Sequence, residues 1–168
     1  MGNTENLSGT TAIKKVQEII KNADTCMFVT NVSSFPLSSR PMNTIKVDDN
    51  GTIWFFSKDN SEKNKHISID SKVQLFYSNH GSSEYISLSG NAQIIRDQKK
   101  VEELWAPVAR NWFRAGKTDP SITLIKFIPE TGHYWDIKTN KMVQLIKLAI
   151  GSLVEATSEN GREGSLTV

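Results

Sequence analysis

Apolar residues near the start of the chain recur every three or four positions. They are Ile13, Val16, Ile19, Ile20 and Ala23, and the positions between them carry lysines and a glutamate. This spacing predicts an amphipathic helix that buries one face. The preceding residues 1–8 are polar, and we expect them to form a flexible N-terminus.

From Thr25 onward the pattern changes to short segments rich in β-branched and aromatic residues. Such segments predict strands, and turn residues separate several of them. The predicted strands are Thr25–Val32, Arg40–Val47, Thr52–Ser57, Lys72–Ser78, Glu84–Arg96, Ile122–Ile128 and His133–Lys138. The turn signals are Asp49-Asn50-Gly51, Asn79-His80-Gly81 and Pro129-Glu130-Thr131-Gly132. Because short links favour antiparallel neighbours, these strands predict a closed or partly closed antiparallel barrel.

Two further segments return to helical spacing. One runs from Val101 to Trp112 behind a candidate N-cap at Asp97, and the other runs from Met142 to Leu153. A turn over 159–164 and a short edge strand over 165–168 follow. We therefore predict an α+β, mainly β fold with peripheral helices. Residues 9–140 form the barrel domain, and residues 141–168 add a C-terminal helix and an edge strand that pack on the same domain.

Composition limits the classes of protein that the chain can represent. Its 168 residues suit one domain, and 38% of them are hydrophobic, which is enough for a packed core. With 20 basic and 18 acidic residues the formal charge is +2, so we expect no nucleic-acid partner. No segment approaches the roughly 20 apolar residues of a membrane span, so we expect no membrane partner. A single cysteine, Cys26, excludes an internal disulfide, and we expect a cytoplasmic protein.

Familiar catalytic motifs are absent from the sequence. It has no glycine-rich phosphate loop, no Gly-x-Gly-x-x-Gly, no His-Glu-x-x-His and no Gly-x-Ser-x-Gly. His66, His80 and His133 lie in different predicted elements without the spacing of metal ligands, so we predict no metal site. Any functional site must therefore be sought in other residue patterns.

The predicted strand around Arg40 carries two cations on one face. Alternation places Arg40 and Lys46 on one face of the strand and Pro41 on the opposite face. This face is either an ordinary solvated surface or an anion-facing wall of the barrel, in which the guanidinium supplies a fixed fork of donors. Because a proline cannot donate to a strand ladder, we expect a bulge or a sheet edge at Pro41.

The segment from Trp54 to Ile67 runs from an aromatic strand through a polar loop into a short predicted helix. With Asn60 or Ser61 as its N-cap, free backbone N–H groups, the helix dipole, a hydroxyl group and Lys63 converge at one point. This arrangement suits a phosphate, and it is also typical of a capped surface helix with solvated lysines. An aromatic slot beside such a point would suit a planar ligand with a phosphate tail.

Several short motifs follow one another in a specific order. They are Ser39-Arg40-Pro41-Met42, Trp54-Phe55-Phe56-Ser57 with Ser61-x-Lys63, Leu88-Ser89-Gly90-x-Ala92, Trp112-Phe113-x-x-Gly116-x-x-Asp119-Pro120 and Tyr134-Trp135-Asp136. Over residues 10–140 this order resembles the pyridoxamine 5'-phosphate oxidase-like, FMN-binding split barrels. Within them the chain is most similar to the general stress protein 26 branch.

The resemblance implies a six-stranded antiparallel split barrel and a homodimer that binds FMN, or else FAD, in clefts at the subunit interface. By position it assigns the phosphate to Arg40, Ser61 and Lys63. It assigns the flavin ring and the closure of the cleft to Pro41, Met42, Phe56, Ser57, Trp112 and Trp135. Residues 138–168 do not match the substrate-binding arginine and histidine pattern of the oxidases, so we do not expect oxidation of vitamin B6.

Two functions follow from the resemblance. One is a flavin-dependent oxidoreductase of unknown substrate, in which the flavin does the redox chemistry. The alternative is a flavin-binding buffer or sensor in the stress response that does not turn over. The same fold also hosts other planar ligands, and a barrel that acts through protein contacts alone stays open.

Overall fold

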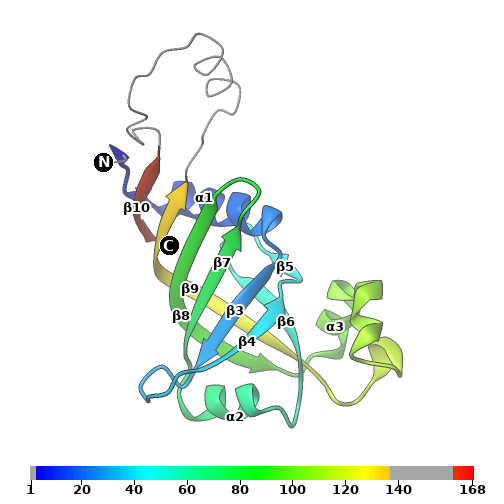
Figure 1. Ribbon diagram of the computed structural model, residues 1–168. Coiled ribbons are helices and arrows are strands. Elements are labelled where there is room, and N and C mark those ends of the chain that lie inside the picture. The colour runs from blue at the N-terminus through cyan, green and yellow to red at the C-terminus, as the bar shows by residue number, and fades with distance from the viewer. Residues whose placement is uncertain (1–2, 137–160) are drawn as a thin grey trace.

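The structure is a computed structural model that describes residues 3–136 and 161–168. The strands form one strongly curled sheet, with helices at its two ends and at one side (Figure 1). The helices are α1 (Gly9–Asn22), α2 (Glu62–Ile69) and α3 (Gln98–Leu104). The strands are β1 (Asn3–Thr4), β2 (Leu7–Ser8), β3 (Thr25–Thr30), β4 (Ser38–Asn43), β5 (Lys46–Val47), β6 (Ile53–Lys58), β7 (Lys72–Asn79), β8 (Glu84–Ile95), β9 (Ile122–Asp136) and β10 (Arg162–Thr167).

The barrel is built from six longer strands that pair antiparallel in the order β4, β3, β7, β8, β9 and β6. This confirms the predicted mainly β fold with peripheral helices. The predicted strand Arg40–Val47 is divided into β4 and β5, and β5 pairs with β6. The remaining short strands extend the sheet at β10, which pairs antiparallel with β9 and parallel with β1 and β2.

The two ends of the described chain form part of this extension. Residues 3–4 and 7–8, expected to lie in a flexible segment, pair with β10, and the backbone N–H of Glu5 donates to the carbonyl oxygen of Glu163. The predicted turn over 159–164 is wrong for residues 162–164, which belong to β10. The predicted helix from Met142 to Leu153 lies outside the described residues.

β9 is one continuous strand where the sequence predicts two strands and a turn. Its first half pairs with β6, its second half pairs with β10, and residues 124–136 pair with β8. A register shift at Ser89 and Gly90 accommodates Pro129 in the strand. A Cβ atom on Gly90 would lie 2.1 Å from the carbonyl oxygen of Ile128, so Gly90 permits a close approach of the paired strands β8 and β9.

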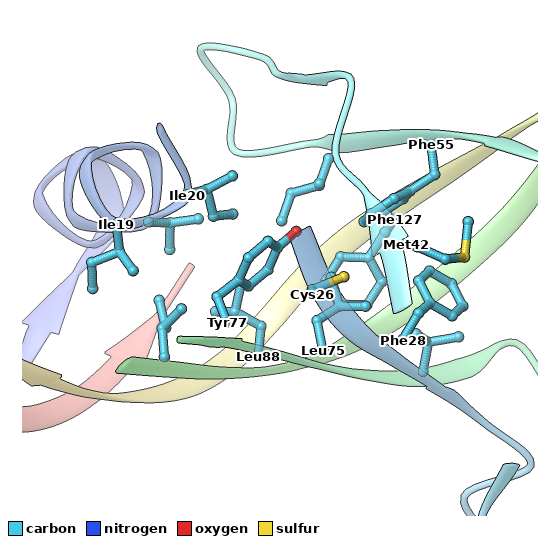
Figure 2. Close-up of a cluster of buried hydrophobic side chains, with 14 of the residues drawn as sticks. Ile19, Ile20, Cys26, Phe28, Met42, Phe55, Leu75, Tyr77, Leu88 and Phe127 are labelled. Atoms are coloured by element: carbon cyan, nitrogen blue, oxygen red, sulfur yellow. The ribbon is translucent and has the colours of Figure 1, made fainter. Parts of the chain in front are cut away.

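The main core fills the barrel under α1. Val16, Ile19 and Ile20 of α1 are buried, which confirms the predicted amphipathic helix. Figure 2 shows these isoleucines beside Tyr77 and Cys26, with the aromatic side chains deeper in the barrel. Phe28 and Phe55 pack edge to face there, with ring centroids 5.2 Å apart.

A second apolar cluster lies on the other side of β6. Phe56 contacts Trp105 and Phe113, with ring centroids 5.7 and 6.0 Å apart. Asp97 caps α3 as predicted, but the helix ends at Leu104 and does not reach Trp112. Pro107 accounts for the early end, because a residue that precedes proline disfavours helical backbone. None of the helices in the described ranges is long and apolar enough to cross a membrane.

Candidate functional site

Arg40 lies on β4, the strand at one end of the hydrogen-bonded order, so the edge position predicted from Pro41 is confirmed. Nη1 of Arg40 donates to the carbonyl oxygen of Phe28 (3.2 Å) and to Oγ1 of Thr30 (2.8 Å), and Nη2 donates to Oγ of Ser38 (2.7 Å). All three acceptors are uncharged. A guanidinium has five N–H groups, so the contacts among the described residues leave two of them for a ligand. Burial lowers the pKa of Arg40.

α2 begins where the sequence predicts, with Ser61 as its N-cap. Oγ of Ser61 accepts a hydrogen bond from the backbone N–H of Asn64 at 3.4 Å, and it lies 3.1 Å from Oγ of Ser57. The backbone N–H groups of Glu62 and Lys63 lie in the first turn, where an α-helix offers no internal acceptor. The start of α2 therefore presents backbone donors and the positive end of the helix dipole.

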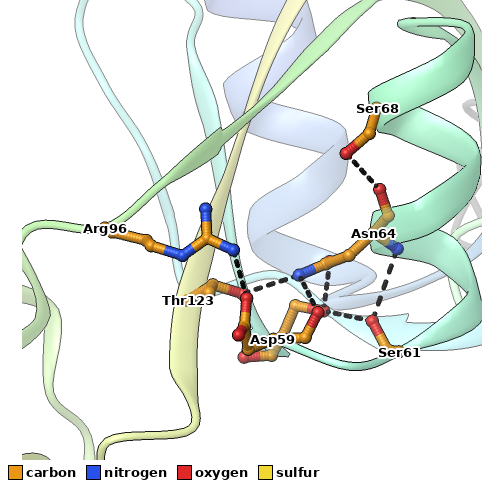
Figure 3. A network of polar contacts seen from close by, with 7 residues as sticks. Asp59, Ser61, Asn64, Ser68, Arg96 and Thr123 are labelled. Atoms are coloured by element: carbon orange, nitrogen blue, oxygen red, sulfur yellow. Dashed lines mark hydrogen bonds and ion pairs between the residues drawn. The ribbon is translucent and has the colours of Figure 1, made fainter.

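A buried amide fixes this helix start against the sheet (Figure 3). Oδ1 of Asn64 accepts from Oγ of Ser57 at 2.8 Å, and Nδ2 donates to Oγ1 of Thr123 at 3.0 Å and to the carbonyl oxygen of Asp59 at 3.4 Å. Asn64, Ser57 and Thr123 are all buried. The network ties α2 to β6 and β9, so the position of the helix start is set by the barrel.

Lys63 stands in the first turn of α2, where the charge of Arg40 acts on it. Burial lowers the pKa of Lys63, and the positive charges of Arg40 and Lys58 lower it further. Neither Arg40 nor Lys63 has a salt-bridge partner within the part of the chain that the structure describes. Two cations that repel each other without a carboxylate between them form a site that an anion would stabilise.

Glu62 does not neutralise this site. Its carboxylate pairs with Lys65 one turn along the helix at 3.2 Å, and both side chains are exposed. Asp59, at the start of the preceding loop, pairs with Arg96. The acidic groups nearest to the start of α2 are therefore engaged with other cations on the surface.

The predicted ring-binding residues of β4 lie on opposite faces. Pro41 is exposed, whereas Met42 is 8% exposed and belongs to the main core. Figure 2 shows the Met42 side chain beside Phe28 inside the barrel. The side chain of Met42 is therefore used in packing and is not free to contact a ligand.

The predicted residues of β6 are also divided between two roles. Ser57 is buried and hydrogen-bonded to Asn64, and Phe56 is partly buried against Trp105 and Phe113. These side chains build the wall behind the helix start. A ligand would meet them through their backbone or through the edge of the second cluster.

Trp112 and Trp135 are exposed by 51% and 39%, and they lie on different parts of the molecule. Trp112 follows a short 3₁₀ helix (Pro107–Asn111) in the segment after α3. Trp135 lies in the half of β9 that pairs with β10, and β9 stands four strands from β4 in the hydrogen-bonded order. Within one chain the structure brings Arg40, Ser61 and Lys63 together and leaves Trp135 apart from them.

Four polar residues of the site were missed from the sequence. Thr30 and Ser38 hold the guanidinium of Arg40, His66 contacts Thr30, and Asn64 anchors α2. One signal for them was present in the sequence, because Asn64 and His66 lie in the predicted helix beside Lys63. That β3 ends next to α2 could be known only from the three-dimensional pairing.

Chemically, the site combines a partly free guanidinium, an ammonium group, a hydroxyl group and helix N–H donors around one point. These are the groups that hold a phosphomonoester in proteins. An aromatic cluster lies beside the point on the second face of β6. Together the fold and the site are those of a split barrel with a cationic edge.

The comparisons with known proteins agree with this description. The sequence matches the family described as pyridoxamine 5'-phosphate oxidase like over residues 11–159. Because the match spans most of the chain, the chain belongs to the pyridoxamine 5'-phosphate oxidase-like family. No curated protein matches the sequence closely enough to count as a relative.

Several solved structures share the fold. A candidate general stress protein 26 from Jannaschia sp. CCS1 has a TM-score of 0.78 and 23% identity, with 95% of this chain and 100% of that chain covered. General stress protein 26 from Bacillus anthracis str. Sterne has a TM-score of 0.63 and 23% identity, with 73% and 92% covered. A general stress FMN/FAD binding protein from Xanthomonas citri has a TM-score of 0.63 and 25% identity, with 74% and 87% covered.

Proposed function

We propose that this chain binds FMN and acts as a flavin-dependent oxidoreductase of the general stress protein 26 branch. The observation that carries the proposal is the pair Arg40 and Lys63: Arg40 is joined to α2 through Thr30 and His66, its charge acts on Lys63 in the first turn of α2, and neither cation has a salt-bridge partner among the described residues. Membership in the pyridoxamine 5'-phosphate oxidase-like family supports the choice of a flavin, as does the similar structure from Xanthomonas citri, whose description includes FMN and FAD.

In this proposal the residues of the chain bind and orient the phosphate end. Arg40 donates its two remaining N–H groups, Lys63 adds a point charge, and Ser61 together with the first-turn N–H groups of α2 completes the cradle. The backbone of Pro41 and Met42 on the edge strand lines the ring. When bound, FMN supplies the electron-transfer chemistry, and the protein contributes orientation and access.

The first test is identification of the ligand on protein purified without added cofactor. We expect a yellow protein that releases FMN on denaturation. Each charge-assisted hydrogen bond is worth about 1.5–3 kcal/mol, so Arg40→Ala and Lys63→Met should each weaken FMN binding by roughly 10- to 100-fold. The matched control is Lys65→Met, because Lys65 is an exposed lysine paired with Glu62. A colourless protein that does not take up FMN would contradict the proposal.

A second candidate is a flavin buffer or sensor without turnover. The two functions separate when NADH or NADPH is added to the loaded protein in air. Repeated oxidation of the nicotinamide supports the oxidoreductase, whereas a bound flavin that is not reduced supports the buffer. Riboflavin binding serves as the measure of ring affinity in both cases, because riboflavin lacks the phosphate.

We also propose that the functional unit is a homodimer. The outer face of the sheet carries Met27 and Phe76 as directly paired neighbours, exposed by 44% and 43%, and Trp135 is exposed two strands further along. A cleft that contains both Arg40 and Trp135 requires a second chain, because one chain keeps them apart. Sedimentation should give about twice 18.8 kDa, and Phe76→Lys should yield a monomer with weakened flavin binding. A monomer that binds FMN normally would contradict the shared cleft.

A further inference from the structure

His66 lies one helical turn after Lys63 and is connected to Arg40 through a single oxygen atom. Nδ1 of His66 lies 2.9 Å from Oγ1 of Thr30, and the same oxygen accepts the hydrogen bond from Nη1 of Arg40 at 2.8 Å. Thr30 is fully buried, with 0% of its surface exposed. Water therefore does not replace either partner, and the imidazole and the guanidinium share this hydroxyl group.

The donor and acceptor in each of these two hydrogen bonds follow from the chemistry of Arg40, Thr30 and His66. A guanidinium only donates, so Arg40 uses one lone pair of the Thr30 oxygen. The hydroxyl proton of Thr30 is then free to bond with a neutral imidazole at Nδ1. This arrangement keeps the oxygen of Thr30 turned toward Arg40. When Nδ1 is protonated, it donates to the second lone pair of Thr30, and the contact persists with one more positive charge.

We infer that His66 is a positioning residue of the anion site and raises the affinity of that site for a phosphomonoester as the pH falls. In its neutral form it holds Arg40 through Thr30. In its protonated form it also adds a third cation to Arg40 and Lys63. The inference rests on the proposed function, in which FMN is the phosphomonoester. The same groups at the start of α2 would bind any phosphate group.

The charges around His66 favour this behaviour. β3 brings no charged group, and β8, which also contacts α2, brings Glu84 at the end away from α2. Acidic groups near α2 are engaged elsewhere: Glu62 with Lys65, Asp59 with Arg96, and Asp70 with Ser33 and the backbone N–H of Lys72. The charged group that the structure connects to the imidazole is Arg40, which shares the hydroxyl group of Thr30 with it.

An anion bound beside Arg40 would favour the protonated form of His66, because opposite charges attract. The coupling is reciprocal: the factor by which the anion increases the proton affinity of His66 equals the factor by which protonation tightens the anion. Histidine side chains change charge between about pH 5 and pH 8, so the coupling acts within the range of cellular conditions. A shift of one pH unit in the titration corresponds to a tenfold change in affinity.

The test compares FMN with riboflavin in the wild-type protein, His66→Asn and His66→Leu between pH 5.5 and pH 8. Asparagine places an uncharged amide near the position of Nδ1, and leucine removes the contact. We expect the FMN-to-riboflavin affinity ratio of His66→Asn to stay within about twofold of wild type at pH 8. On acidification the wild-type ratio should gain about tenfold relative to His66→Asn. Comparing variants at each pH cancels the titration of the FMN phosphate itself, which lies near pH 6.

His66→Leu should lower the ratio about fivefold at pH 8, and the control His80→Asn should behave as wild type, because His80 lies in an exposed turn. Equal pH dependence in wild type and His66→Asn overturns the inference and leaves FMN binding intact. If no flavin binds at all, the proposed function fails, and the inference is decided by NMR titration of His66 with inorganic phosphate. A higher titration midpoint in phosphate supports it, and an unchanged midpoint overturns it.

Discussion

Asn64→Ala should destabilise the protein by about 3 kcal/mol. The substitution removes two short hydrogen bonds, from Oγ of Ser57 (2.8 Å) and to Oγ1 of Thr123 (3.0 Å), and a longer one to the carbonyl oxygen of Asp59. A buried hydrogen bond contributes about 1 kcal/mol, and a buried polar atom left without its partner costs a further 1 kcal/mol or more. Ser57 and Thr123 are 2% and 1% exposed, so water does not compensate for the loss.

The loss can be measured by urea unfolding, followed by circular dichroism and by tryptophan fluorescence. The matched control is Asn91→Ala. Asn91 also makes two side-chain hydrogen bonds, to Ser71 and Glu130, but both are exposed to solvent. We expect the control to lose less than about 1 kcal/mol. A loss below 1 kcal/mol for Asn64→Ala, with the fold intact, would show that the network does not anchor α2.

Asn64→Asp extends the same prediction to pH. The new carboxylate would face the carbonyl oxygen of Asp59 in a buried position, so its pKa would be raised in the folded protein. A raised folded pKa means that stability is retained at low pH and lost as the pH rises through that pKa. The variant should therefore be more stable at pH 5 than at pH 7, relative to wild type. The opposite trend would contradict the assignment of Nδ2 as the donor.

Three further predictions concern the buried thiol of Cys26, the close approach of β8 and β9 at Gly90, and the ion pair between Lys15 and Asp136. Burial raises the pKa of Cys26 from 9.0 to about 12, so above pH 9 the unfolded thiol ionises first and the free energy of unfolding falls by up to about 1.4 kcal/mol per pH unit. Between pH 9 and pH 10, Cys26→Ala should lack this slope in urea titrations, and a parallel slope would refute the effect. Gly90→Ala should cost 2 kcal/mol or more, because its Cβ would clash with a carbonyl oxygen, whereas Gly81→Ala should be close to neutral in the same assay. Lys15→Met should cost about 3 kcal/mol, because Lys15 pairs with the buried Asp136 at 2.5 Å; a thermal melt unchanged from wild type would contradict this.

Local sequence patterns predicted the elements that depend on local chemistry. The face of α1, the Ser61 cap of α2, the Asp97 cap of α3 and the edge position of Pro41 all follow from residues within one or two turns. The early end of α3 also has a local cause, since Pro107 excludes helical backbone at the preceding residue.

Features set by distant partners were not predictable in the same way. Pro129 and Gly132 are residues typical of turns. However, β8 is long enough to pair with both halves of β9, so the segment forms one continuous strand. A Cβ on Gly132 would lie 2.5 Å from the carbonyl oxygen of Ser87, so this glycine also serves a close strand contact. His66 and Thr30 are 36 positions apart, and only the barrel brings them together.

The pairing of β10 has a consequence for the order in which the chain matures during synthesis. β1 and β2 leave the ribosome before the rest of the described chain, and among the described residues their sheet partner is Arg162–Thr167. Until those residues emerge, the described chain offers no partner for β1 and β2 or for the matching edge of residues 131–136 of β9. The extended edge of the sheet is therefore assembled after Arg162–Thr167 have been synthesised, whereas the partners that bring Arg40 and Lys63 together have all emerged by residue 136.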